Sequence, residues 1–111
     1  MIFPQKERLK GRIEIRNVFN QKKMVSCSGA RLFIVKNGLT HNRIAFTFSK
    51  RFGKAVQRNR ARRLSREAYR HLRRDLKPGY DLVLLIYPGH DDFNFRIKQL
   101  HELLSQAGLL G

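Results

Sequence analysis

Hydrophobic positions change their spacing along the chain, and each change predicts a different element. Branched and aromatic residues form two short runs, over residues 30–36 and 43–49, with Asn37-Gly38 between them. Such runs are typical of strands, and Asn-Gly is typical of a tight turn, so we expect two paired strands that run antiparallel. Residues 24–28 are ambiguous and are compatible with a short edge strand.

Helical spacing follows the second of these strands. The apolar positions of residues 57–76 recur every three or four residues, at Ala61, Leu64, Ala68 and Leu72. This spacing predicts a helix with one apolar face, which the Lys-Pro-Gly sequence of residues 77–79 ends. We expect that face to pack against the alternate apolar side chains of the strand before it, which are Ile44, Phe46 and Phe48.

Further segments complete the predicted fold. Residues 81–87 form a continuous apolar run, which is typical of a strand covered on both faces and makes a βαβ unit with the strand and helix before it. Amphipathic spacing predicts a short helix over residues 12–21 and a closing helix over residues 93–106. The order α-β-β-α-β-α predicts a single-domain α+β sandwich over residues 1–111, in which helices lie on a central mixed sheet. Residues 1–10 are expected to form a flexible arm.

The central helix carries a second, basic pattern. Arginines recur at four-residue spacing, at Arg58, Arg62, Arg66 and Arg70. No Asp or Glu occurs between Glu14 and Glu67, so little in the sequence compensates these charges. Like charges at this spacing destabilise a helix by roughly 0.2–0.5 kcal/mol per pair, which indicates a polyanion as partner, because the guanidinium fork binds two phosphate oxygens at once. The alternative is a solvated charged face, which usually mixes both signs.

Composition supports a nucleic-acid partner. The 111 residues carry a formal net charge of +16, which favours nucleic acid first and an anionic membrane second. No predicted helix pairs a broad apolar face with interfacial lysines, and the apolar run of residues 82–87 is too short to cross a bilayer, so we expect no membrane partner. Cys27 is the only cysteine, which excludes an internal disulfide and is compatible with the cytoplasm.

The residues that could carry nuclease chemistry form no recognisable site. The histidines share no local motif; they are His41, His71, His90 and His101. Asp91-Asp92 is explained better as the cap of a helix than as a metal site, and the sequence has neither a phosphate-binding glycine loop nor zinc-ligand spacing. We therefore expect no catalytic residue, metal ligand or tightly bound cofactor in the chain itself. A protein-only nuclease and a ribosomal-type RNA-binding module stay open as alternatives.

One ordered motif spans the turn between the second strand and the basic helix. Its parts are Ser-Lys-Arg at residues 49–51, Gly-Lys-Ala-Val at residues 53–56 and Arg-Asn-Arg-Ala-Arg-Arg-Leu-Ser-Arg-Glu at residues 58–67. In this motif, and more loosely in the elements around it, the chain resembles the protein subunit of bacterial ribonuclease P. The motif is specific because it is long and is embedded in a strand, a turn and a helix.

The resemblance implies a fold and a role. The fold is the ribosomal-protein-S5-domain-2-like sandwich with a left-handed βαβ crossover, although about 98% of such crossovers in proteins are right-handed. The family's protein subunit is not catalytic, because a large RNA subunit uses bound Mg²⁺ to remove the 5′ leader of precursor tRNA. The protein binds that ribonuclease P RNA as a monomer, one copy per RNA, and holds the leader in a cleft between the sheet and the first helix. The expected location is the cytoplasm.

The resemblance also assigns residues by position. Those expected to bind the RNA subunit are Lys50, Arg51, Lys54, Arg58, Asn59, Arg60, Arg62, Arg63, Arg66 and Arg70. Those expected to line the leader cleft are Ile15, Phe19, Phe33, Val35, Thr47 and Ser49. An aromatic side chain such as Phe19 can stack a single-stranded base, but Ile15 stands where many members carry a second aromatic residue, and Val35 where some carry a tyrosine. The alternatives stay open that Phe19 is a core residue and that Thr47 and Ser49 are ordinary solvent-facing residues.

Overall fold

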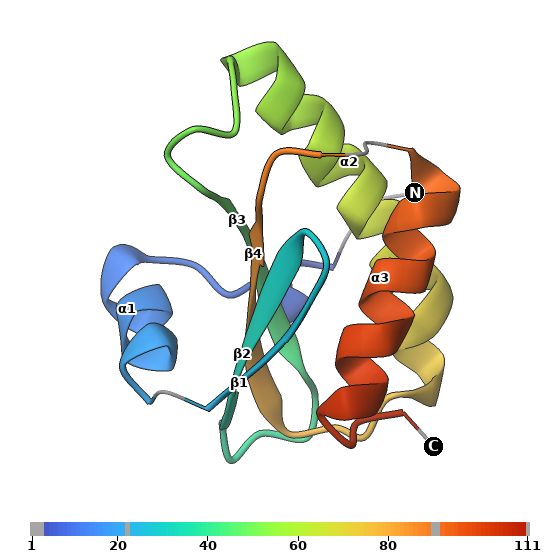
Figure 1. Cartoon of the computed structure of the whole chain (residues 1–111). Coiled ribbons are helices and arrows are strands. Elements are labelled where there is room, and N and C mark those ends of the chain that lie inside the picture. Colours follow the sequence, from blue (N-terminus) through green and yellow to red (C-terminus); the bar gives the residue numbers. More distant parts are fainter. Residues whose placement is uncertain (1–3, 22, 90–91, 111) are drawn as a thin grey trace.

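The computed structural model describes residues 4–21, 23–89 and 92–110, and in that part of the chain helices lie on both faces of one four-stranded sheet (Figure 1). The α-helices are α1 (Arg12–Asn20), α2 (Ala55–Leu72) and α3 (Phe93–Gln106), and the strands are β1 (Met24–Cys27), β2 (Ala30–Lys36), β3 (Arg43–Phe48) and β4 (Tyr80–Ile86). Two 3₁₀ turns, η1 (Gln5–Glu7) and η2 (Arg73–Asp75), precede α1 and follow α2. The predicted α+β sandwich is confirmed, and its elements fall within a few residues of their predicted bounds.

The strand order places β4 inside the sheet, between β2 and β3. The order is β1-β2-β4-β3, with β4 antiparallel to β2 and parallel to β3. β2 and β3 therefore run antiparallel to each other, as the sequence predicts, but the expectation that they pair is wrong because β4 lies between them. The physical reason is the apolar run of β4, which needs cover on both faces and a neighbour at both edges. The ambiguous residues 24–28 contribute β1, the edge strand beside β2.

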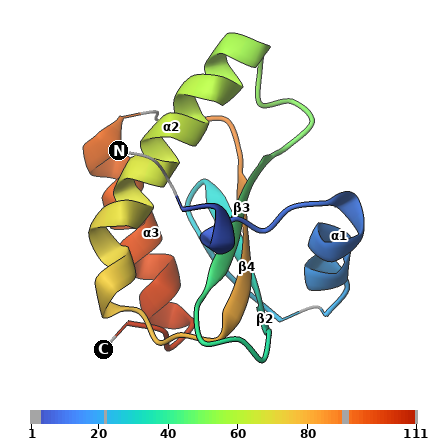
Figure 2. The same ribbon diagram turned by 180° about the vertical axis from the view of Figure 1, so that it is seen from behind.

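The connection from β3 through α2 to β4 is left-handed. Both strands run upwards in Figure 1, α2 lies to their right and β3 lies behind β4, whereas the reverse view places β3 in front (Figure 2). A path that goes up β3, down α2 and up β4 while moving toward the viewer of Figure 1 winds left-handedly. General chirality rules favour the opposite hand, so this feature was predictable only from the family resemblance, which is confirmed here.

The main core lies between the sheet and the helices α2 and α3. β2 and β4 direct alternate side chains into this layer, in keeping with the two-residue period of a strand. Several of them have no more than 1% of their surface exposed, among them Leu32, Ile34, Leu82 and Leu84. Ile44 of β3 joins the same core, and Phe46 and Phe48 pack against it, so the predicted inward face of that strand is confirmed.

The buried face of α2 differs from the predicted one. Ala61 and Ala68 are buried as expected, but Leu64 is only half-buried, and Ser65 and Tyr69 lie in the core instead. The Ser65 hydroxyl donates a hydrogen bond to the Ala61 carbonyl oxygen (2.7 Å), so burial leaves it satisfied. A stripe identified from apolar residues alone misses such positions, because polar side chains enter a core once their polar atoms are bonded.

Helix α1 packs on the opposite face of the sheet. Leu9, Val18, Ala45 and Val83 form a second, smaller core there, with 7% or less of each residue exposed. In Figure 1, α1 covers only the lower part of this face, and no helix covers the upper ends of β3 and β4 on that side. We call this uncovered part the open face.

Residues 4–10 are held against the body of the protein. The Arg73 guanidinium contacts both oxygens of the Glu7 carboxylate (2.9 and 2.8 Å), and Arg8 bridges the outer edge of β3 at Ile44. The segment thereby crosses the sheet edge between α1 and α2 (Figure 2). The sequence predicts a flexible arm over residues 1–10, whereas these contacts anchor residues 4–10 to parts of the protein that are distant in the chain. The first three residues of the expected arm lie outside the described residues.

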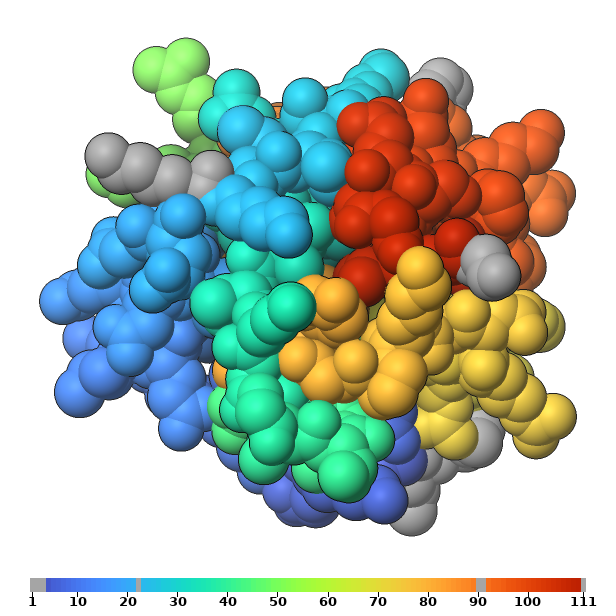
Figure 3. Space-filling view, turned by 90° about the horizontal axis from the view of Figure 1, so that it is seen from below, coloured from blue at the N-terminus to red at the C-terminus, as the bar shows by residue number. Residues whose placement is uncertain are grey.

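A partly buried ion pair lies at the lower end of the sheet in Figure 1, where β3 and β4 begin. The Arg43 guanidinium donates two hydrogen bonds to the Asp81 carboxylate (2.8 and 2.7 Å), and the Asn37 side-chain amide donates a third (2.9 Å). Asp81 is only 7% exposed, and these bonds compensate for the loss of contact between its carboxylate and water. Figure 3, seen from that end, shows the turn after β2 beside the segment that leads into β4, and the Asn42 amide joins them by donating to the Lys77 carbonyl oxygen (2.9 Å).

We predict that Leu82→Ala lowers the free energy of unfolding by about 2–5 kcal/mol, because Leu82 is fully buried inside the sheet. The half-buried Leu64 offers a matched control. Leu64→Ala removes less buried apolar surface, so it should lower the free energy of unfolding clearly less. Urea denaturation followed by circular dichroism measures both variants. Equal losses would contradict the difference in burial.

Candidate RNA-binding site

The loop after β3 turns sharply into α2 and presents the first basic residues. Gly53 has a φ of 139°, a backbone conformation that residues with a Cβ atom rarely adopt, so glycine is favoured there. The Gln57 side-chain oxygen accepts the Lys54 backbone N–H (2.8 Å), which satisfies a donor at the start of the helix. The Arg58 guanidinium donates to the Gly53 carbonyl oxygen (2.6 Å). These contacts fix the helix start, while Lys50 in the loop stays exposed.

All residues predicted to bind the RNA subunit reach the surface. The exposed ones are Lys50, Arg51, Lys54, Asn59, Arg60 and Arg63. The half-buried ones are Arg58, Arg62, Arg66 and Arg70. The half-buried set is the four-residue row of α2, so this row lies against other parts of the protein as well as solvent.

The arginine row of α2 divides into two parts. Arg70 forms an ion pair with Glu67, so its charge is compensated. Arg62 donates a hydrogen bond to a neutral group, the Asn59 side-chain oxygen (3.0 Å), and its guanidinium carbon lies 5.1 Å from the centre of the Phe48 ring. Among the described residues, no carboxylate pairs with the first three members of the row, which are Arg58, Arg62 and Arg66.

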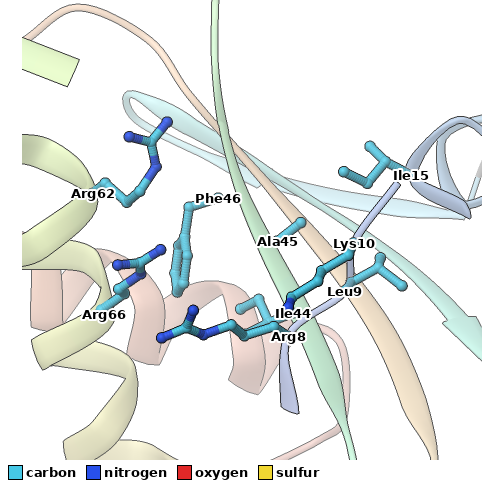
Figure 4. Close-up of a pocket in the computed structure, with 9 residues that line it drawn as sticks. All are labelled: Arg8, Leu9, Lys10, Ile15, Ile44, Ala45, Phe46, Arg62 and Arg66. Carbon is cyan, nitrogen blue, oxygen red and sulfur yellow. The ribbon is translucent and has the colours of Figure 1, made fainter. Parts of the chain in front are cut away.

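A cavity of about 250 Å³ lies between α2 and the N-terminal segment (Figure 4). Arg62 and Arg66 reach it from α2, and Arg8 and Lys10 reach it from the N-terminal segment. The Phe46 ring lies beside Arg62 and Arg66 and above the Arg8 guanidinium in Figure 4, and it forms an apolar wall. We call this site, defined by its four cations, the basic cavity. Its charge and polarity suit a phosphate group.

The charges of the basic cavity repel one another. Burial lowers the pKa of Arg66, and the nearby charges of Arg8 and Arg62 lower it further. Arginine nevertheless stays protonated at physiological pH, so the repulsion persists in the free protein. An anion in the cavity would relieve this repulsion, which gives the free protein an electrostatic preference for phosphate.

Two of the four cations escape prediction from sequence. Arg8 and Lys10 reach the basic cavity because the N-terminal segment pairs with the outer edge of β3 at Ile44. Their only signal in the sequence is positive charge, in a stretch without strand or helix spacing. The pairing that positions them is a long-range contact, which no local pattern reveals.

Four of the six residues predicted to line the leader cleft come together where α1 meets the sheet. Phe19 of α1 and Phe33 of β2 pack edge to face, with ring centres 4.6 Å apart. Ile15 and Val35 pack on the same small core. All four are half-buried, so each contributes to the core and keeps part of its surface accessible.

Thr47 and Ser49 lie farther along the same face, toward the basic loop. The half-buried Thr47 hydroxyl donates to the Leu84 carbonyl oxygen (2.9 Å). The Ser49 hydroxyl oxygen is buried and has no hydrogen-bond partner among the described residues. Leu85, the β4 neighbour of Thr47, is also half-buried, although the residues on both sides of it in the strand are buried. This part of the sheet is therefore the accessible open face rather than core.

The histidines do not converge on one site. The His41 ring nitrogen lies 3.0 Å from a backbone carbonyl oxygen of the N-terminal segment, and His71 lies 3.7 Å from the Glu67 carboxylate. His101 is exposed on α3. Within the part of the chain that the structure describes, no group of three or more His, Cys, Asp or Glu side chains could hold a metal ion.

The remaining candidates for chemistry have structural explanations or cannot be placed. Asp92 caps α3, because its carboxylate accepts a backbone N–H of the first turn (2.9 Å). Burial raises the pKa of the Cys27 thiol to about 11, with a further contribution from Glu102, so little reactive thiolate exists at neutral pH. His90 and Asp91 lie outside the described residues.

These features define a class of protein. Basic side chains bind phosphates irrespective of base sequence, and accessible aromatic rings stack unpaired bases. A small α+β sandwich that carries a basic helix, the basic cavity and aromatic side chains beside an open sheet face is an RNA-binding protein. None of the helices in the described residues combines the length and the apolar character needed to cross a membrane.

Comparison with known proteins identifies the family. The family model described as Ribonuclease P matches residues 3–108. The ribonuclease P protein component of Clostridium botulinum is 38% identical, with 86% of this chain and 89% of that protein covered. The ribonuclease P protein component of Dictyoglomus turgidum is 32% identical, with 97% and 94% covered. The chain belongs to the ribonuclease P protein family.

Solved structures agree with this assignment. The RNase P protein from Thermotoga maritima is similar with a TM-score of 0.78 at 27% identity, over 90% of this chain and 96% of that one. The RNase P protein of Staphylococcus aureus gives a TM-score of 0.84 over 95% and 98% of the two chains, and at 18% identity this likeness shows the fold alone. The fold expected from the resemblance is confirmed.

We predict that Arg66→Met raises the free energy of unfolding at low salt by about 0.2–0.5 kcal/mol, because it removes one of the repelling charges and keeps a long side chain that suits a helix. The gain should shrink as salt screens the remaining charges. Arg63→Met is the control, since Arg63 is exposed on the same helix and does not line the basic cavity. Urea denaturation at several salt concentrations measures both, and a loss of stability in Arg66→Met would argue against repulsion.

Proposed function

We propose that this chain binds the catalytic RNA of ribonuclease P with one surface and the 5′ leader of precursor tRNA with another. Its family is that of the protein component of this ribonucleoprotein, which matures the 5′ end of tRNA. On this proposal the protein supplies binding energy and the RNA subunit carries out the hydrolysis with its bound Mg²⁺. No residue of the chain takes part in the chemistry.

The observation that carries the RNA-binding surface is the group of cations without carboxylate partners. Arg58, Arg62 and Arg66 follow one another along α2, and the last two line the basic cavity. Contact with phosphate would neutralise charges that otherwise repel, so binding energy is available at this site. Arg70 contributes less on this proposal, because Glu67 already pairs with it. The exposed members of the surface are Lys50, Arg51, Lys54, Asn59, Arg60 and Arg63.

The leader surface is supported by the accessible aromatic side chains beside α1. Phe19 and Phe33 keep part of their surface free, and the open face continues from them toward Thr47 and Leu85. Single-stranded RNA exposes unpaired bases that stack on such rings, whereas a duplex keeps its bases inside. This surface therefore favours precursor tRNA, which carries a single-stranded leader, over mature tRNA.

We also propose the setting in which the chain acts. It works as a monomer, with one copy per RNA subunit, in the cytoplasm. The single Cys27 supports that location, because the chain has no disulfide that would need an oxidising compartment. Binding to a large polyanion also explains why a domain of this size keeps a net charge of +16.

We predict that the chain strongly stimulates cleavage of precursor tRNA by a ribonuclease P RNA at low millimolar magnesium, and that the chain alone cleaves nothing. Arg62→Met should weaken binding to that RNA and reduce the slope of log affinity against log salt by about one, because it removes one phosphate contact. The measurements are cleavage rates with and without the protein and binding titrations at several salt concentrations.

The control for this experiment is Lys98→Met, which removes an exposed charge from α3 and should change neither affinity nor salt dependence. Tight RNA binding without stimulation would indicate a ribosomal-type module instead. Cleavage by the purified chain alone would indicate a protein-only nuclease.

We predict that Phe19→Leu reduces the preference for precursor over mature tRNA by roughly five- to a hundredfold, which corresponds to the loss of one stacked base. Leucine retains most of the apolar volume, so the free energy of unfolding should fall by less than about 1.5 kcal/mol. Competition between the two tRNAs on the assembled holoenzyme measures the preference. Phe95→Leu on α3 is the control, and an equal loss of affinity for both tRNAs in Phe19→Leu would rule out a leader site.

A further inference from the structure

Glu7 is an acidic residue within a basic segment. It is the only carboxylate in the first 13 residues of the sequence, where Lys6, Arg8 and Lys10 surround it. Its carboxylate accepts two hydrogen bonds from the Arg73 guanidinium (2.9 and 2.8 Å), and only 17% of the Glu7 side chain and 24% of the Arg73 side chain are exposed. An acid weakens the attraction of this segment for a polyanion, so charge alone does not explain its presence.

The ion pair joins the N-terminal segment to the end of α2. Arg8 and Lys10 reach the basic cavity, where they meet the arginines of α2. Arg8 is close enough to Arg66 for its charge to lower the pKa of that guanidinium, so like charges repel the segment from the helix. Glu7 supplies an attraction of the opposite sign, because it binds Arg73, about two helical turns beyond Arg66.

Arg8 lies between two anchors. On one side of it, Glu7 binds Arg73. On the other side, Leu9 is buried in the smaller core, and its backbone N–H donates to the Ile44 carbonyl oxygen (3.0 Å). The Leu9 anchor fixes only one end of the Arg8 backbone. The ion pair fixes the other end, so the two anchors together keep the Arg8 side chain at the basic cavity against the repulsion.

We propose that Glu7 is a positioning residue for RNA binding, which through its ion pair with Arg73 holds Arg8 and Lys10 at the basic cavity, where they bind a phosphate of the ribonuclease P RNA. This inference rests on the proposed function, in which the basic cavity belongs to the RNA-binding surface. Cations that are held in place before binding lose less conformational entropy when the RNA arrives than cations on a loose segment. This gain outweighs the repulsion between one carboxylate and the RNA.

The test is Glu7→Gln, because the net charge and the ion pair predict effects of opposite sign. The substitution raises the net charge of +16 by one, which by itself strengthens binding to RNA. Loss of the ion pair releases Arg8 and should instead weaken binding by roughly tenfold. It should also reduce the slope of log affinity against log salt by about one, as the loss of one phosphate contact does. Titrations of the full chain with ribonuclease P RNA at several salt concentrations measure both effects.

Two further variants show whether the ion pair is the cause. Arg73→Met should weaken binding too, and Glu7→Gln should weaken it no further in the Arg73→Met background, because the pair is already broken there. Asp75→Asn is the matched control, since it removes the same charge from an exposed residue two positions after Arg73 and should not weaken binding. Urea denaturation shows that each variant is folded under the conditions of the titration.

The positioning role is overturned if Glu7→Gln binds the RNA as tightly as the wild type or more tightly, or if it loses affinity without a change in the salt slope. It is also overturned if Asp75→Asn loses as much affinity, or if Glu7→Gln has its full effect in the Arg73→Met background. Arg62→Met separates this proposal from the proposed function. A loss of affinity in Arg62→Met with none in Glu7→Gln overturns the positioning role alone, whereas full affinity in both variants also overturns the proposed RNA-binding surface.

Discussion

Burial of β4 on both faces is the constraint on which the rest of the structure depends. Leu82, Val83, Leu84 and Ile86 are fully buried, so the strand needs helical cover on each side and a hydrogen-bonded neighbour at each edge. α2 and α3 cover one side, and α1 covers the lower part of the other. Because β4 lies inside the sheet, β3 becomes an edge strand, and its outer edge is free to pair with the N-terminal segment that brings Arg8 to the basic cavity.

The distribution of charge is uneven within this architecture. Four described carboxylates bind arginines that do not line the basic cavity, and the pairs are Glu7–Arg73, Glu67–Arg70, Asp81–Arg43 and Glu14–Arg43. No described carboxylate pairs with Arg62 or Arg66, so repulsion is concentrated where partial burial strengthens it. A chain with few acids could spread them among its cations. Because the carboxylates lie elsewhere, the positive charges around the basic cavity are not neutralised, which suits a polyanionic partner.

Local sequence patterns predicted the helices and strands. The strand order and the position of the N-terminal segment depend on long-range pairing, which the sequence does not show. A strand or helix buries side chains at a spacing that its own geometry sets. The sequence therefore shows the alternation in β3, the helical spacing in α2 and the apolar run of β4. The insertion of β4 between β2 and β3 and the docking of residues 4–10 depend on edges that meet only in the folded chain. The motif of residues 49–67 located the basic helix, but the ion pair between Glu7 and Arg73 joins residues that are far apart in the chain and has no sequence signal.

The two proposed surfaces meet at one short strand, β3, and both of its faces contribute to them. Phe46 of β3 forms a wall of the basic cavity, and its neighbour Thr47 belongs to the open face. A slip of one residue in the register of β3 would exchange these faces and move the Phe46 side chain out of the cavity. The Arg43–Asp81 ion pair joins β3 to β4 at the lower end, where their register begins. Arg43 and Asp81 lie directly opposite each other in the two strands, so the hydrogen bonds between them favour the observed register.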